Sequence, residues 1–582
     1  MSYTTISDLP QPTSELQFSD VAVTHGLVVP MRDGTDLRLD LLRPRTDGPH
    51  PVVLIRTPYD KVVQRELPEG TKRGLPYDHD FMHSLVRRGY ILAIQDVRGR
   101  FNSDGYWHPY VHEQDDGHDT VEWIVRQPWC DGNIGMVGRS YVGFTQWAAA
   151  VTTPRGLKAI VPIGAQSDLF VCGFPIYNGV FNLPMGELAV TMGHRSFQIV
   201  DFMNNVLTTS HDYFETLPIA EMMQEIGTET PSWWTEMMSH PTRDHYWRRG
   251  SYAEALNNVS VPALNVSGWY DPTFYGALEN FGQVRTHGAT GDARDGQRLV
   301  MGPWGHWANA SAATGPIDFG PGAVIGLNGY VIRFLDRWLK GEANGVDNDD
   351  RVHVFVMGAN EWWAASDWPL PQTRYVRFYL HSGGNANGDE GDGSISLEAP
   401  GAEPHDSFAY DPLDPVRGSW SMHEGPIDDR AISDRRDVLS YTSEPLKQPL
   451  DVVGPLSCTL HAASSARDTD WHIRLVDVHP SGYAQFLAHG MLRARFRQSF
   501  EHPKFLEPGR PEVFELDLGA TANRFLPGHR IRLEIMSSWY PRYDRNLNSG
   551  AENPFRDSTP IVAQQTILHN DARPSSVLLP VV

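Results

Sequence analysis

The sequence predicts an α/β core with an inserted helical segment, followed by an all-β domain of the jelly-roll type. Up to about residue 168, continuous apolar runs alternate with helical patterns, which is typical of βαβ units on a mostly parallel sheet. Met- and aromatic-rich helical patterns interrupt that alternation, which then resumes. After residue 350, short alternating strands are separated by turn residues, as in an antiparallel sandwich. We expect the core at 1–166 and 257–345, the insertion at 167–256 and the β domain at 346–582.

The first half of the core begins with a predicted hairpin. Residues 21–48 alternate apolar and polar side chains on both sides of Asp33-Gly34, and an Asp-Gly pair between such runs is a strong hairpin signal. Runs that are apolar throughout fit strands that are buried on both faces. The elements that follow are strands at 51–59 (PVVLIRTPY), 90–96, 133–138 and 157–165, and helices at 81–90, 119–127 and 141–151.

The insertion separates two groups of core strands. Its helical patterns include 218–226 and 232–240, both rich in Met. A helical insertion between two strands of one sheet is the simplest account. The core elements that come after it are strands at 261–269 and 298–304 and helices at 275–284 and 328–341, and a segment of linker composition follows at 341–350.

The C-terminal region is predicted to be all-β. Its expected strands are VHVFVM (352–357), RYVRFYL (374–380), LSCTLHAA (456–463), DWHIRLVDV (470–478), FELDL (514–518) and RIRLEIMSS (530–538). The Gly- and Asp-rich segment 383–394 lacks the ligand spacing and the closing Glu of an EF-hand, so we expect a hairpin loop there and not a calcium site.

Composition excludes several classes of protein. The 582 residues carry 49 Lys and Arg against 71 Asp and Glu, a net charge of −22, which argues against nucleic acid and anionic membranes as partners. Three cysteines, Cys130, Cys172 and Cys458, exclude a disulfide scaffold and favour a reducing compartment. The first residues lack the features of a signal peptide, and no apolar run in the sequence is long enough to span a membrane. We therefore expect a cytoplasmic protein.

The sharpest local motif surrounds Ser140. The segment from Gly135 to Gly143 (GMVGRSYVG) follows a predicted strand and opens a helix, which is the context of a nucleophile elbow. There a strained turn exposes the serine hydroxyl, and the next N–H points at the forming oxyanion. The general pattern is G-x-S-x-G, whereas Val142 stands here at the last glycine position. A serine that only caps the helix is the alternative.

Chain order supplies the acid and the base. In α/β-hydrolases the nucleophile is followed by an Asp or Glu and then by a His, each in a loop after a strand. Asp271 follows the strand at 261–269, and His306 follows the strand at 298–304. Asp168 is the competing acid, but it comes one strand earlier. Three candidate residues in this order, each after a core strand, are difficult to assign to chance.

A second oxyanion donor is expected in the loop after the strand at 51–59. That loop contains Tyr59 and no HGGG-like stretch, and a tyrosine hydroxyl can donate to an oxyanion. The alternative for Tyr59 is a packed turn aromatic.

Several motifs together resemble the CocE/NonD hydrolases, a family that includes esterases, α-amino acid ester hydrolases, cephalosporin acylases and X-Pro dipeptidyl-peptidases. The resemblance covers nearly the whole chain. The matching segments are RTPYDK (56–61), DVRG (96–99), SDG (103–105), WCDGN (129–133), GRSYVG (138–143), GWYD (268–271), GPWGH (302–306) and SSWYPRYDRN (537–546).

The resemblance implies a fold and a role for each matched residue. The fold would be an α/β-hydrolase core with an inserted helical cap, plus a C-terminal all-β jelly-roll domain. Ser140 would be the nucleophile, His306 the base and Asp271 the acid that orients it. Tyr141 would give its backbone N–H, and Tyr59 its hydroxyl, to the oxyanion. The family's elbow, G-x-S-Y-x-G, also accounts for Val142. The segment 96–99 is expected to support the active-site loops through an internal ion pair.

One departure bears on the substrate. The amino-ester hydrolases place acidic residues just after the triad Asp, where they hold the substrate's ammonium group, but here Asp271 is followed by Pro272, Thr273, Phe274 and Tyr275. We therefore expect an apolar or aromatic acyl group. Three aromatic residues close to the triad are candidate pocket walls: Phe274, Trp307 and Trp269.

The sequence thus predicts a serine hydrolase that cleaves small-molecule carboxylic esters through an acyl-enzyme, with amides left open. It is expected to need no cofactor and no metal; the histidines of 240–245 are too isolated for a zinc site. A β-lactam side-chain acylase or an X-Pro dipeptidyl-peptidase is the alternative among hydrolases. A ligand- or carbohydrate-binding protein on an inactive hydrolase scaffold is the alternative from another class. A homo-oligomer also stays open.

Overall fold

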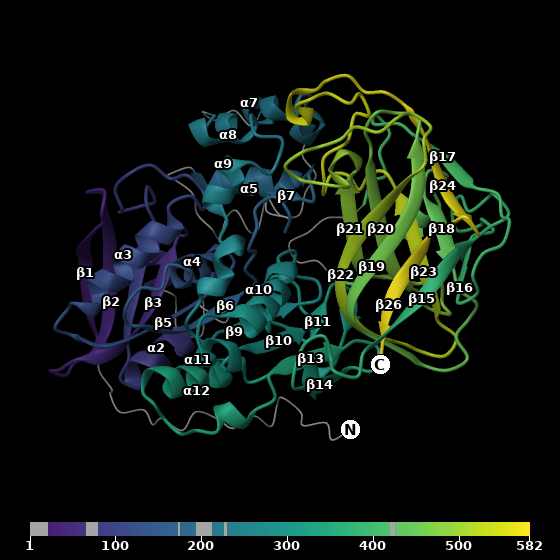
Figure 1. Ribbon diagram of the computed structural model, residues 1–582. Coiled ribbons are helices and arrows are strands. Elements are labelled where there is room, and N and C mark those ends of the chain that lie inside the picture. The colour runs from purple at the N-terminus through teal and green to yellow at the C-terminus, as the bar shows by residue number, and fades with distance from the viewer. Residues whose placement is uncertain are drawn as a thin grey trace.

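The computed structural model describes residues 21–65, 79–172, 175–193, 212–225, 230–418, 425–428 and 430–582. Two large sheets organise this part of the chain, a core sheet of ten strands and a second sheet of twelve. Figure 1 shows the two sheets side by side, with the insertion lying above the core and reaching the β domain. No helix in the described residues has the length and apolar character needed to cross a lipid bilayer.

The core sheet is parallel in its centre and antiparallel at both edges. Its first two strands pair around Asp33-Gly34, so the predicted hairpin is confirmed. The strands in spatial order are β1 (Val21–Pro30), β2 (Asp36–Pro44), β4 (Ile91–Asp96), β3 (His50–Thr57), β5 (Cys130–Arg139), β6 (Leu157–Ile163), β9 (Leu264–Gly268), β10 (Arg298–Gly302), β13 (Val352–Val356) and β14 (Glu361–Ala365).

Helices cover both faces of the core sheet (Figure 1). One face carries α3 (Glu113–Val125) and α4 (Tyr141–Ala150), and every residue of α4 is buried. The other face carries α2 (His79–Arg87) and α12 (Leu327–Leu339). The remaining core helices are α1 (Lys61–Arg65), α10 (Phe274–His287) and α11 (Gly291–Asp295).

The predicted helical insertion lies between β6 and β9, but its described helices are short. Pro218 and Pro231 each stand just before a helix, and a proline cannot continue a preceding helix, so each marks where a short helical piece begins. The described pieces are β7 (Ile176–Tyr177), β8 (Val180–Phe181), α5 (Leu183–Gly193), α7 (Met222–Glu225), α8 (Ser232–Met237) and α9 (His245–Gly250).

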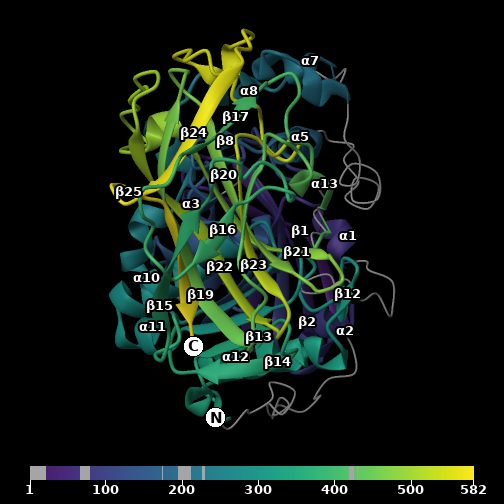
Figure 2. The same cartoon turned by 90° about the vertical axis from the view of Figure 1, so that its right-hand side faces the viewer.

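The β domain is antiparallel except where β16 pairs with β18. Figure 2 views the chain from this side, with β19 and β23 crossing the middle of the picture. Its strands are β15 (Arg374–His381), β16 (Ser394–Ser396), β17 (Asp406–Tyr410), β18 (Leu439–Thr442), β19 (Leu450–Ser464), β20 (Asp470–Val478), β21 (Ala484–Arg493), β22 (Glu512–Phe525), β23 (Arg530–Met536), β24 (Ala563–Asn570), β25 (Arg573–Pro574) and β26 (Ser576–Val581).

One predicted strand belongs to the other sheet. The segment VHVFVM was expected to open the β domain, but β13 pairs in parallel with β10 and in antiparallel with β14. An apolar alternating run fits either sheet, and only the partner at Leu299–Met301 decides between them. The core sheet therefore continues to Ala365, and the second sheet begins at β15.

Candidate active site

Ser140 lies in a strained turn between β5 and α4. Its backbone has φ 62° and ψ −127°, a conformation that costs a non-glycine residue about 1–3 kcal/mol and persists only where the surroundings enforce it. The Ser140 N–H donates to the Ile163 carbonyl over 2.8 Å, which ties the turn to β6. The Ser140 side chain makes no capping hydrogen bond to the described amides of α4, so the cap reading of this residue is wrong.

The glycines around Ser140 explain the altered elbow motif. A Cβ at Gly138 would lie 2.1 Å from Val142 Cγ1, so the missing side chain of Gly138 makes room for Val142. A Cβ at Gly143 would lie 3.0 Å from the Ile163 carbonyl oxygen. Close packing of α4 on β6 therefore favours glycine at position 143, and the valine at 142 is accommodated by Gly138.

The two expected oxyanion donors lie together beside Ser140. The Tyr59 hydroxyl is hydrogen-bonded to the Ser140 side chain and to the backbone N–H of Tyr141. Burial raises the pKa of the Tyr59 hydroxyl, and the hydrogen bonds of Ser140 and Tyr141 only partly oppose that rise. Tyr59 therefore keeps its proton at neutral pH, as a donor to an oxyanion must.

The loop that carries Tyr59 is supported by the DVRG segment. Asp96 accepts a hydrogen bond from the Lys61 N–H over 2.8 Å and lies 3.3 Å from Lys61 Nζ. Arg98 forms ion pairs of 2.6 Å with both Asp33 and Asp116. Internal ion pairs of the expected kind thus join β4, the Tyr59 loop and α3.

Asp271 and His306 form a buried pair. His306 Nδ1 lies 3.0 Å from Asp271 Oδ1, which also accepts hydrogen bonds from the Thr273 N–H and hydroxyl. The Ser267 hydroxyl donates to Asp271 Oδ2 over 3.0 Å. Burial alone would raise the pKa of Asp271, but His306 and Thr273 outweigh it and hold the pKa below its usual value. The carboxylate is therefore charged and fixed in orientation.

Two observations place the serine turn beside the His306 loop and the end of β6 beside Asp271. The Arg139 guanidinium lies 3.9 Å from the ring centre of Trp307, and these residues flank Ser140 and His306 in the sequence. A Cβ at Gly164, directly after β6, would lie 2.5 Å from Asp271 Oδ2. Asp168 is engaged elsewhere, because Arg243 of the insertion pairs with its carboxylate at 2.7 Å.

The three predicted pocket residues differ in their surroundings. Trp269 donates its indole N–H to the Phe355 carbonyl over 2.8 Å, as a core residue would. Phe274 is buried, and its ring packs against Gly519 of β22. Trp307 is half-buried, stacks on Arg139 and lines a cavity beside the His306 loop. Trp307 is thus the best placed of the three to meet a substrate, and the pocket role of all three stays a prediction.

The β domain also holds the loop that carries Asp271. The Tyr275 hydroxyl donates to the His489 carbonyl over 2.6 Å, and the Tyr270 hydroxyl lies 3.3 Å from the Phe486 carbonyl. Both acceptors belong to β21. Sequence reasoning missed these contacts because more than 200 residues separate the partners. Every residue has a backbone carbonyl, so no residue type indicates which carbonyl will be the acceptor.

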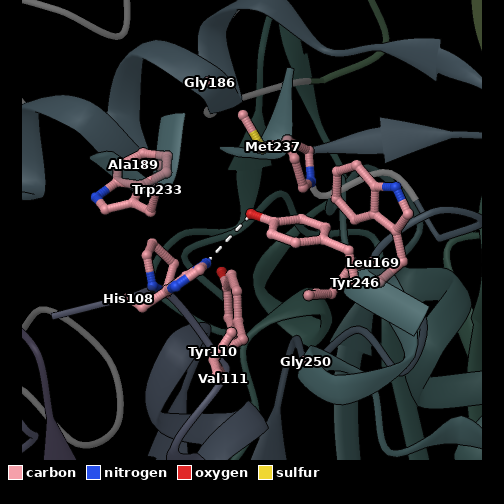
Figure 3. A pocket seen from close by; sticks show the side chains of 13 residues that line it. His108, Tyr110, Val111, Leu169, Gly186, Ala189, Trp233, Met237, Tyr246 and Gly250 are labelled. Carbon is pink, nitrogen blue, oxygen red and sulfur yellow. Dashed lines mark hydrogen bonds between the residues drawn. The ribbon is translucent and has the colours of Figure 1, made fainter. Parts of the chain in front are cut away.

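A small cavity between the insertion and the loop before α3 reaches the neighbourhood of Tyr141. Figure 3 shows its lining of aromatic and aliphatic residues, in which His108 and the Tyr246 hydroxyl share a hydrogen bond of 3.2 Å. Burial lowers the pKa of His108 to about 4, so the ring is neutral at pH 7. Tyr110, on the cavity wall, stacks on Tyr141 with ring centres 4.5 Å apart.

Replacing Tyr59 with phenylalanine is expected to lower kcat for aryl esters by about 10–1000-fold, since one oxyanion donor is lost while the ring still packs. Steady-state kinetics on purified protein, with the thermal unfolding midpoint measured in parallel, check this. A variant with unchanged kcat would show that the Tyr59 hydroxyl does not serve the oxyanion.

Comparisons with known proteins agree with this geometry. Residues 33–308 match the family model described as X-Pro dipeptidyl-peptidase (S15 family), and residues 344–578 match the X-Pro dipeptidyl-peptidase C-terminal non-catalytic domain. Cocaine esterase from Rhodococcus sp. (strain MB1 Bresler) is 37% identical, covering 96% of this chain and 99% of its own.

Solved structures extend the likeness over the whole fold. An aminopeptidase from a Thaumarchaeota archaeon superimposes with a TM-score of 0.81 at 26% identity, covering 99% of both chains. An α-amino acid ester hydrolase superimposes with a TM-score of 0.79 at 24% identity, covering 99% of this chain and all of its own. With the strained serine, the buried Asp–His pair and the C-terminal β domain, these relationships show that the chain belongs to the CocE/NonD family of serine hydrolases.

Proposed function

We propose that this protein hydrolyses small-molecule carboxylic esters with an apolar or aromatic acyl group, through an acyl-enzyme on Ser140. The observation that carries the proposal is the strained Ser140 turn with the Tyr59 hydroxyl and the Tyr141 N–H beside its side chain. The buried Asp271–His306 pair supplies an oriented base in the adjacent loops.

In the proposed mechanism, Ser140 Oγ attacks the ester carbonyl while His306 takes its proton. Asp271 holds the imidazole by its Nδ1–H and stabilises the cation that forms. The carbonyl oxygen becomes an oxyanion and accepts hydrogen bonds from the Tyr59 hydroxyl and the Tyr141 N–H. The C–O bond then breaks, and the alcohol leaves with the proton from His306. A water that gives its proton to His306 attacks the acyl-enzyme, and the acid departs as Ser140 recovers its proton.

The acyl preference rests on the residues after Asp271. Pro272, Thr273, Phe274 and Tyr275 offer no carboxylate to an ammonium group, so an uncharged acyl group is the better match. The three cysteines are free and buried, which supports a cytoplasmic location.

The second candidate is an amide-cleaving activity of the X-Pro dipeptidyl-peptidase or acylase kind, which the family-model matches favour. A side-by-side panel of aryl esters, cephalosporin side-chain amides and Xaa-Pro anilides distinguishes the two. We expect the highest kcat/KM on aryl esters with uncharged acyl groups. Turnover of Xaa-Pro anilides alone would replace the ester proposal by the peptidase one.

A further inference from the structure

Beneath the proposed oxyanion hole lies a buried ion pair that the mechanism above does not use. Glu113, the first residue of α3, and Arg56 of β3 are 2% and 0% exposed, and Arg56 Nη1 lies 2.8 Å from Glu113 Oε2. Arg56 also donates through Nε to Gln95 Oε1 over 2.9 Å and through Nη1 to the Glu113 carbonyl over 3.2 Å. Separating the two side chains would leave a buried charge without its partner, which costs free energy, so the pair keeps both side chains in place.

The second carboxylate oxygen of Glu113 holds Tyr141. The Tyr141 hydroxyl donates to Glu113 Oε1 over 2.8 Å and accepts from the Tyr110 N–H over 2.9 Å. The Tyr141 ring also stacks on Tyr110, with an angle of 24° between the ring planes. With its hydroxyl bonded on both sides and its ring stacked, this side chain has one well-defined position.

Tyr141 connects the network to the reacting atoms through its own backbone. Its N–H is hydrogen-bonded to the Tyr59 hydroxyl, and its peptide bond joins it to Ser140, whose backbone is strained. A strained turn relaxes unless its surroundings oppose the relaxation. An anchored Tyr141 side chain opposes rotation of the peptide that carries the N–H.

The same ion pair reaches the other donor. Arg56 lies in β3, three residues before Tyr59 in the loop that follows, and its carbonyl accepts from the Thr145 hydroxyl of α4 over 3.3 Å. Arg56, through Glu113 and its bond to the Tyr141 hydroxyl, thus connects the segment that leads to Tyr59 with the first turn of α4.

We infer that Glu113 is a positioning residue for the oxyanion hole: through the Tyr141 hydroxyl and Arg56 it sets the distance between the Tyr141 N–H and the Tyr59 hydroxyl. Glu113 does not touch substrate. The inference rests on the proposed function and adds a residue that acts only through these two donors.

The main test variant is Tyr141→Phe, which removes the hydroxyl and keeps both the backbone N–H and the Arg56–Glu113 pair. We expect kcat for an aryl ester to fall about tenfold with KM unchanged within twofold, because misplaced donors act on the transition state. The Ki of an aryl trifluoromethyl ketone, whose adduct with Ser140 places an oxyanion in the hole, is expected to rise by the same factor. Glu113→Gln, which keeps an acceptor for Tyr141 and loses the charge, should move both quantities in the same direction.

Tyr90→Phe is the matched control, since the Tyr90 hydroxyl donates to the buried Asp336 over 2.7 Å on the opposite face of the sheet. It loses the same kind of hydrogen bond, so its unfolding midpoint should fall comparably while kcat and Ki stay within twofold. If Tyr141→Phe also kept kcat and Ki within twofold, the network would be structural only and the inference wrong. A Ser140→Ala variant measured alongside distinguishes failure of the proposed function from failure of this inference. If Ser140→Ala kept its activity, the proposed function would be overturned. If Ser140→Ala were inactive and Tyr141→Phe were unaffected, only this inference would be overturned.

Discussion

Ser140→Ala is expected to lower kcat for short-chain p-nitrophenyl esters by about 10⁴–10⁶-fold, because nucleophile, base and acid act as a unit. The loss should be chemical and not structural. Alanine keeps the Cβ that makes φ 62° strained, so the backbone of the turn is equally costly for both residues. Initial rates at saturating ester, with circular dichroism and the unfolding midpoint as checks of the fold, measure the effect.

Two companion measurements sharpen this result. A fluorophosphonate probe should label the wild-type protein at Ser140 and leave Ser140→Ala unlabelled. Failure to label folded wild-type protein would favour an inactive, ligand-binding scaffold.

Ser140→Gly should be as inactive as Ser140→Ala, but its free energy of unfolding should be higher than that of Ser140→Ala by about 1–3 kcal/mol, since glycine adopts this conformation without strain. A rate that is unchanged in Ser140→Ala would end the nucleophile assignment.

Asp271→Asn is expected to lower kcat by about 10²–10⁴-fold with a small effect on KM. An amide oxygen in place of Oδ1 can still accept from Thr273, so the fold is kept. The amide oxygen can also still accept from the His306 Nδ1–H, as Asp271 Oδ1 does in the wild type, but the negative charge that stabilises protonated His306 is lost. Stopped-flow measurement of acylation, compared with steady-state kcat, reports the affected step.

The matched control is Asp168→Asn, the same substitution in the other acid that follows a core strand. Asp168 pairs with Arg243 and accepts the N–H groups of Phe170 and Val171, so its loss should lower the unfolding midpoint and leave kcat within a few-fold. If Asp168→Asn abolished turnover and Asp271→Asn did not, the roles of the two acids would be reversed.

The sequence predicted most of the core because each signal is local. The period of the apolar runs separated strands from helices, Asp33-Gly34 marked the hairpin, and the elbow motif marked Ser140. Chain order then selected Asp271 and His306, since the carboxyl ends of parallel strands meet at one edge of a sheet.

The errors have a common cause. The segment VHVFVM reads equally well as a strand of either sheet, and its hydrogen bonds to β10 decided the matter. The pattern at 232–240 was expected to be helical, but α8 ends at Met237, because periodicity does not fix where a helix ends. Both errors concern the partner or the limit of an element and not its type.

The sequence by itself determined the strand and helix types, the serine turn and the order of the proposed triad, because these depend on residues within a few positions of one another or on strand order. Only the tertiary structure decided what holds the site in shape: the Arg56–Glu113 pair under Tyr141, the stacking of Arg139 on Trp307, and the β21 carbonyls that hold Tyr270 and Tyr275. The physical reason is that desolvated ion pairs, ring contacts and backbone acceptors are made between distant segments. Packing within the core brings the first two pairs together, and packing of β21 against the segment after β9 supplies the third set of contacts.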